Sequence, residues 1–133
     1  MRIGIVNDLS LAVEALRRVI LMVENLEIAW VAYDGKQAVE LAIKDRPDLI
    51  LMDLIMPVMD GVQATAEIMK KSPCAILVVT ASVGGNSSKV FEAMGHGALD
   101  AVATPVFDFS GNATGADELI AKINSLKRLI QGK

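Results

Sequence analysis

The chain has 133 residues, 53% of them hydrophobic, and a net charge of −3, which fits one domain with a single core. No basic run is longer than two residues, which argues against nucleic acid as a direct partner. No apolar run approaches the roughly 20 residues that cross a bilayer, and no signal peptide precedes the first predicted strand. The single cysteine cannot form an internal disulfide. We therefore expect a cytoplasmic protein without a membrane partner.

Apolar runs and helical patterns alternate along the chain. Five runs are predicted to be β-strands: residues 2–6, 27–32, 48–52, 75–79 and 99–103. Between them, apolar residues recur every three or four positions, as on one face of a helix. Helices are predicted over about residues 9–23, 38–42 and 62–69, from about residue 86, and over residues 116–130. The second helix is expected to stop before Pro47 and the third near Pro73.

Helical connections between apolar strands require a parallel sheet, and right-handed crossovers leave few topologies. We predict an α/β fold: a doubly wound, flavodoxin-like sheet of five parallel strands in the order 2-1-3-4-5, with five helices. Residues 107–115, rich in Gly, Asn and Thr, are expected to form a loop. No repeat or second domain is visible, so residues 1–133 are assigned to one domain.

Polar side chains follow the predicted strands at the edge where such folds bind ligands. Asn7 and Asp8 follow the first strand, and Asp53 follows the third. Thr80 and Thr104 follow the fourth and fifth. Two carboxylates at one edge repel each other unless they share a cation, and Mg²⁺ suits oxygen ligands and bridges to phosphate. Because a carboxylate can also act as a nucleophile towards phosphorus, the sequence predicts a Mg²⁺-dependent acceptor site.

Two stretches of the sequence carry a family resemblance. Residues 53–61, DLIMPVMDG, resemble the signature of two-component response-regulator receivers, which have a CheY-like fold, and the resemblance extends over the whole chain. Residues 91–105, FEAMGHGALDAVATP, are similar to receivers of chemotaxis protein-glutamate methylesterases. The opening MRIGIVNDLSLAVEALRR and the run PDLILMDLIMPVMDG look like the methylesterases of Wsp-type surface-sensing clusters.

The receiver resemblance implies a role for each residue of the acidic site. Asp53 would be the phospho-acceptor of a histidine kinase. Asp8 would ligate Mg²⁺ together with Asp53, and the backbone carbonyl of Ile55 would complete the protein ligands. Asn7 would contribute through water or a hydrogen bond. Thr80 would bond a phosphoryl oxygen and shift inward on activation.

The narrower resemblance implies partners for the domain. In that family the receiver precedes a C-terminal hydrolase domain that demethylates chemoreceptors, and a chemotaxis histidine kinase supplies the phosphoryl group. No Gly-x-Ser-x-Gly motif occurs here, so we expect a regulatory fragment without hydrolase residues, whose methylesterase domain lies outside residues 1–133. The high apolar content leaves a weak homodimer open.

Three positions depart from the receiver pattern. The first acid after strand one is Asn7, which removes one charge from the metal site. Thr104 replaces the usual lysine; it can donate one hydrogen bond to the phosphoryl group but brings no charge. Ala101 replaces the usual aromatic residue of the fifth strand. Two readings follow: a working receiver with weakened phosphoryl contacts, or a degenerate receiver that regulates by protein contact alone.

Simpler roles stay open for several of these residues. Asp8 could cap the first helix, Asn7 could form a turn, and Thr80 could be an ordinary residue at a strand end. Asp60 is predicted to be a turn and helix-cap residue. A flavin- or nucleotide-binding domain of the same architecture would need a phosphate loop after the first strand, where this chain has NDLSLA, without glycine.

Overall fold

The computed structural model describes residues 1–131. The main strands are β1 (Arg2–Val6), β2 (Glu27–Ala32), β3 (Leu49–Met52), β4 (Ala75–Thr80) and β5 (Asp100–Ala103). The helices are α1 (Ser10–Leu21), α2 (Gly35–Lys44), α3 (Gly61–Lys71), α4 (Ser87–Gly95) and α5 (Ala116–Gln131). A short hairpin consists of β6 (Val106–Phe107) and β7 (Ala113–Thr114). Among residues 1–131, no helix is both long and apolar enough to cross a membrane.

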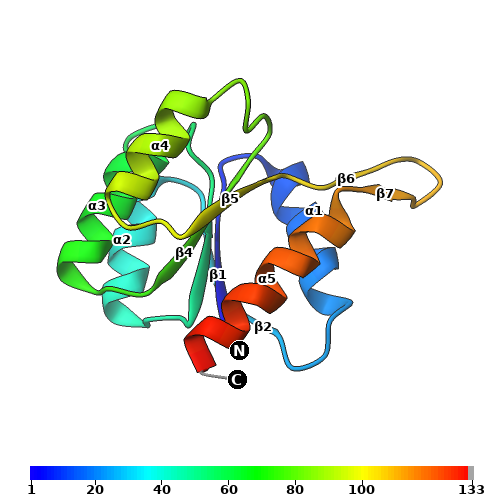
Figure 1. Cartoon of the computed structure of the whole chain (residues 1–133), viewed down its shortest axis with the longest axis horizontal. Helices are drawn as coiled ribbons and strands as arrows, with labels where there is room; N and C mark the ends of the chain where they lie inside the picture. The colour runs from blue at the N-terminus through cyan, green and yellow to red at the C-terminus, as the bar shows by residue number, and fades with distance from the viewer. Residues whose placement is uncertain (132–133) are drawn as a thin grey trace.

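The five main strands form one parallel sheet in the order β2-β1-β3-β4-β5, which confirms the predicted fold class and strand order. Helices α1 and α5 cover one face of this sheet, and α2, α3 and α4 cover the other (Figure 1). Strand residues alternate between the two faces: Leu51 joins the core beneath α1 and α5, whereas Met52 joins the opposite core. Because both faces are covered, the central strands are continuous apolar runs.

The order of the strands places a crevice at one edge of the sheet. Strand β1 pairs with β2 on one side and with β3 on the other. The connections that leave β1 and β3 therefore diverge to opposite faces, and the carboxyl ends of these two strands are left open between them. In open α/β sheets this switch point is where ligands bind. Residues 7, 8 and 53 directly follow these two strand ends.

The hairpin is the main departure from the predicted elements, because residues 107–115 were expected to be a loop. Strands β6 and β7 pair antiparallel, and Phe107 is opposite Ala113. The carboxylate of Asp108 accepts hydrogen bonds from the amides of Ser110 and Asn112, both at 2.9 Å, and so closes the turn. Two strands of two residues each are too short to show a period, so no sequence pattern indicated them.

Candidate functional site

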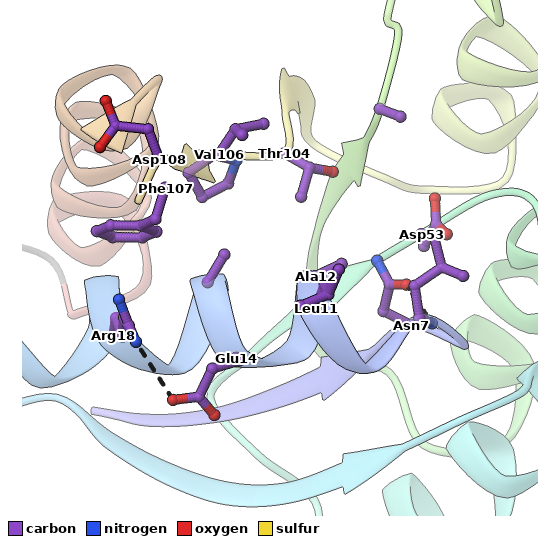
Figure 2. A pocket seen from close by; sticks show the side chains of 14 residues that line it. Asn7, Leu11, Ala12, Glu14, Arg18, Asp53, Thr104, Val106, Phe107 and Asp108 are labelled. Carbon is purple, nitrogen blue, oxygen red and sulfur yellow. Dashed lines mark hydrogen bonds and ion pairs between the residues drawn. The ribbon is translucent and has the colours of Figure 1, made fainter. Parts of the chain in front are cut away.

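Three buried polar side chains gather at the carboxyl edge of the sheet. Asn7, Asp53 and Thr80 are 2%, 8% and 1% exposed. The amide of Asn7 donates to the carbonyl of Ala32 at 3.0 Å, and the amide of Asp53 donates to the carbonyl of Val6 at 2.9 Å. Both residues are thus held by the backbone ladder of the sheet, and Figure 2 shows their side chains beside each other. The fold brings the predicted strand-end residues together.

The carboxyl group of Asp53 lies where ionisation is opposed. Burial raises its pKa above the ordinary value, and the negative charge of Asp8 raises the pKa further. The amide of Leu54 donates to Asp53 Oδ1 at 2.8 Å. This amide, the Thr80 hydroxyl and the Ile55 amide each lower the pKa in part, but the net shift is upward. A positive charge near Asp53 would offset both the cost of burying the ionised carboxylate and its repulsion by Asp8.

The donor set at this edge fits a magnesium ion. Asp8 is half-buried, and its charge reaches Asp53, so the two carboxylates are near enough to repel each other. No group of three or more His, Cys, Asp or Glu side chains within the described chain could hold a metal. A cation here would therefore use two carboxylates and neutral oxygens, as Mg²⁺ does when it keeps several waters. Ile55, the third predicted ligand, lies in the loop after Asp53.

The two threonines sit on adjacent strands. Thr80 is the last residue of β4, and its carbonyl accepts the amide of Thr104 at 3.0 Å. Thr104 is half-buried, follows β5, and lines the same cavity as Asp53. The Thr80 hydroxyl also accepts a hydrogen bond of 3.3 Å from Nδ2 of Asn86. The sequence did not indicate this contact, because an asparagine directly before a helix normally caps it, whereas the Asn86 side chain makes no such cap on α4.

Three neighbouring polar residues differ in their turn and cap roles. Oδ1 of Asn7 accepts the amide of Leu9 at 2.9 Å, so Asn7 forms a turn while it also lines the site. The N-cap residue of α1 is Leu9, and it makes no side-chain cap, so Asp8 is not the cap of this helix. Asp60 is the N-cap of α3 and accepts the amide of Gln63 at 2.9 Å, which confirms the predicted cap.

A cavity of about 420 Å³ opens beside Asp53, between α1 and the segment that leads into the hairpin (Figure 2). Asn7, Asp53 and Thr104 line its polar end. Its other walls are largely apolar and come from Leu9, Leu11, Ala12, Ala15, Val106 and Phe107. At the far end the guanidinium carbon of Arg18 lies 5.3 Å from the centre of the Phe107 ring, and Arg18 also pairs with Glu14 at 3.7 Å. Asp53 is therefore reachable from outside through this cavity.

Comparison with known proteins agrees with this geometry. Residues 3–109 match the family described as response regulator receiver domain. The chain belongs to the response regulator receiver family. It is 57% identical over 133 residues to protein-glutamate methylesterase/protein-glutamine glutaminase 2 of Cupriavidus metallidurans, and 58% identical over 130 residues to protein-glutamate methylesterase/protein-glutamine glutaminase 4 of Burkholderia thailandensis.

A solved receiver structure is similar as well. The response regulator domain of Thermotoga maritima CheB matches with a TM-score of 0.84 at 31% identity, and the match covers 94% of each chain. The resemblance to receivers of methylesterases is thus confirmed. The chain spans 39% of the length of the Cupriavidus relative and 38% of the length of the Burkholderia relative. The first match includes 100% of this chain and the second 98%.

The raised pKa of Asp53 predicts a pH dependence of stability. In the folded protein Asp53 holds its proton more tightly than in the unfolded chain. The ionisation of Asp53 therefore lowers the free energy of unfolding as the pH rises from 3.8 to the raised pKa of the folded state. Asp53→Asn removes that loss. Without divalent cations, we expect the variant to be more stable than wild type at neutral pH, and the difference to shrink on acidification. Urea unfolding of both proteins in EDTA over a pH series measures this difference in stability. A difference in the free energy of unfolding that stays constant with pH would contradict the prediction.

Proposed function

We propose that this receiver domain accepts a phosphoryl group on Asp53 from the phosphohistidine of a chemotaxis-type histidine kinase. The modification would regulate a protein-glutamate methylesterase domain of the same protein, as the names and the greater lengths of its relatives suggest. Methylated chemoreceptors are then the indirect partners, and the cytoplasm is the proposed location. The observation that carries this proposal is a buried carboxylate at the switch point of the sheet, repelled by a second carboxylate and reachable from a cavity.

The orientation of Asp53 suits nucleophilic attack. Its Oδ1 accepts the Leu54 amide, which fixes the carboxylate and leaves Oδ2 to attack phosphorus. As the new O–P bond forms, the P–N bond of phosphohistidine breaks, and its electron pair leaves with the imidazole. The product is an acyl phosphate. Water later attacks the phosphorus, releases inorganic phosphate and restores the carboxylate.

The remaining site residues would bind and orient the phosphoryl group. Thr80 and Thr104 would donate hydrogen bonds to its oxygens from adjacent strands. Asp8, Asp53 and the Ile55 carbonyl would hold Mg²⁺, with Asn7 acting through water. When bound, this ion supplies positive charge that neutralises the phosphoryl oxygens. Because Thr104 carries no charge where receivers usually have lysine, the phosphoryl group would be held less tightly than in a typical receiver.

Intact-mass analysis after incubation with acetyl phosphate tests the proposal. The chain should gain one phosphoryl group in the presence of Mg²⁺ and none in EDTA. A chain that stays unmodified under both conditions would support the other reading of the sequence, in which a degenerate receiver acts by protein contact alone. The measurement needs no kinase, because a small phosphodonor can reach the cavity beside Asp53.

Thr104→Lys should strengthen the site. The new ammonium would lie at the polar end of the cavity and add a charge-assisted hydrogen bond, worth about 1.5 to 3 kcal/mol. We expect the steady-state phosphorylated fraction at limiting acetyl phosphate to rise, because the site would bind the phosphoryl group roughly 10- to 150-fold more tightly. Thr114→Lys, the same change at an exposed residue of the hairpin, is the control and should have no effect. Equal phosphorylation of both variants would argue against a phosphoryl contact at position 104.

A further inference from the structure

Asn86 joins the acceptor edge of the sheet to the start of α4. Its carbonyl accepts the Val90 amide at 3.0 Å, the first hydrogen bond of this helix. An asparagine at this position normally caps the helix with its side chain, but here it does not. Instead, Nδ2 donates to Oγ1 of Thr80 at 3.3 Å. The side chain that would cap α4 is thus directed at the strand end next to Asp53.

This contact restricts the Thr80 hydroxyl. A hydroxyl has one proton to donate and two lone pairs that accept. The Asn86 amide occupies a lone pair, so the proton of Thr80 must be directed elsewhere. Thr80 is 1% exposed, so bulk water does not compete for that proton. The Thr80 hydroxyl lowers the pKa of Asp53, as a hydrogen-bond donor to the carboxylate would. Because a carboxylate can only accept, a Thr80 proton directed at Asp53 would complete a chain of donation from Asn86 through Thr80 to Asp53.

We infer that Asn86 is a positioning residue for phosphoryl transfer, because its amide orients the Thr80 hydroxyl to donate towards the acceptor carboxylate and then towards the phosphoryl group. The inference rests on the proposed function of Asp53 and goes beyond it by naming a residue outside the site. Asn86 also directly precedes α4. A shift of Thr80 towards a phosphoryl oxygen would therefore lengthen or break its hydrogen bond with the Asn86 side chain at the start of this helix. The same contact therefore links the acceptor to α4.

The backbone around Asn86 is held independently of its side chain. The Asn86 amide donates to the Ser82 carbonyl at 3.1 Å, and Oγ of Ser82 accepts the Gly85 amide at 2.9 Å. Together with the bond from Val90, these contacts fix the turn that leads into α4. Side-chain substitutions at position 86 should therefore leave the fold intact, which makes them suitable for a kinetic test.

Two substitutions separate positioning from helix capping. Asn86→Ala removes the donor. Asn86→Asp keeps the size and caps a helix as well as asparagine, but it replaces the donating amide with an acceptor that would draw the Thr80 proton away from Asp53. Ser87→Ala, at the exposed first residue of α4, is the matched control.

The rate of phosphorylation by acetyl phosphate, measured over a range of Mg²⁺ concentrations, gives the decisive comparison. We expect the maximal rate to fall about 3- to 10-fold in Asn86→Ala, as for the loss of one hydrogen bond, and at least as much in Asn86→Asp. The Mg²⁺ concentration for half-maximal rate should not change in Asn86→Ala, because Asn86 is no proposed ligand. Ser87→Ala should match wild type, and the urea midpoint of Asn86→Asp should equal that of wild type.

Each other outcome has a distinct meaning. If Asn86→Asp is phosphorylated as fast as wild type, Asn86 acts as a cap or as an acceptor from Thr80, and the inference is wrong. The same follows if Asn86→Ala keeps the wild-type rate. If wild type itself is not modified in Mg²⁺, the proposed function fails, and the inference fails with it.

Discussion

Replacing Gly61 with alanine should lower the free energy of unfolding by about 3 kcal/mol, at the upper end of the cost of overpacking. A Cβ at this position would lie 2.0 Å from the carbonyl oxygen of Asp53 and 2.8 Å from the Cα of Leu54. Both are backbone atoms next to a buried strand and cannot move aside as a flexible side chain would. The Gly61 amide also donates to the Leu54 carbonyl at 2.9 Å, which closes the loop beside Asp53. Urea unfolding at neutral pH measures the change.

Gly84→Ala is the control for this prediction. A Cβ at Gly84 would have no neighbouring atom within 4 Å, and this residue also lies in a loop close to the site. Its stability should match wild type or rise by roughly 0.4 to 1 kcal/mol, because alanine restricts the unfolded chain. A Gly61→Ala variant as stable as Gly84→Ala would show that the loop after β3 can move away from α3.

Asp8→Asn should weaken the binding of Mg²⁺ that phosphorylation requires more than any other single change outside Asp53. The substitution removes one of the two carboxylates proposed to hold the ion, and it also removes the repulsion that raises the pKa of Asp53. Loss of even an outer partner of a metal ligand costs about 10- to 100-fold in affinity, so we expect the half-saturating Mg²⁺ concentration to rise by at least that factor. Initial rates with acetyl phosphate over a Mg²⁺ titration measure it.

Asp117→Asn, an exposed residue in the first turn of α5, makes the same change of charge away from the acceptor edge. Its Mg²⁺ dependence should be that of wild type. If Asp8→Asn and Asp117→Asn behave alike, Asp8 is not a metal ligand, and what remains of its role at the site is the repulsion that raises the pKa of Asp53.

The architecture could be predicted because its main determinants are local and strong. Runs such as residues 49–52 are apolar on both faces, which indicates a strand covered on both sides, and the intervening helical periods exclude an antiparallel hairpin order. The hairpin β6–β7 could not be predicted in the same way. Besides its backbone bonds, its turn is closed by the side chain of Asp108, which accepts from two amides. An aspartate in a Gly- and Asn-rich segment is equally typical of an irregular loop.

The candidate site was predictable to the extent that it follows the ends of strands. Asp8, Asp53 and Thr80 come directly after or at the end of apolar runs, so the topology of the sheet brings them together. Asn86 was not predictable, since it is six positions beyond Thr80 in a polar loop. An asparagine before a helix is expected to cap that helix, and only the fold shows that a buried hydroxyl takes its side chain instead.

Locating the phosphoryl group on the chain tests the central claim most directly. Borohydride reduces an aspartyl phosphate to homoserine, so peptide mapping after incubation with acetyl phosphate, Mg²⁺ and borohydride marks the acceptor. We predict homoserine at position 53 in wild type and none in the Asp53→Asn variant. Homoserine at position 8, or at no position, would contradict the assignment of Asp53 as the acceptor.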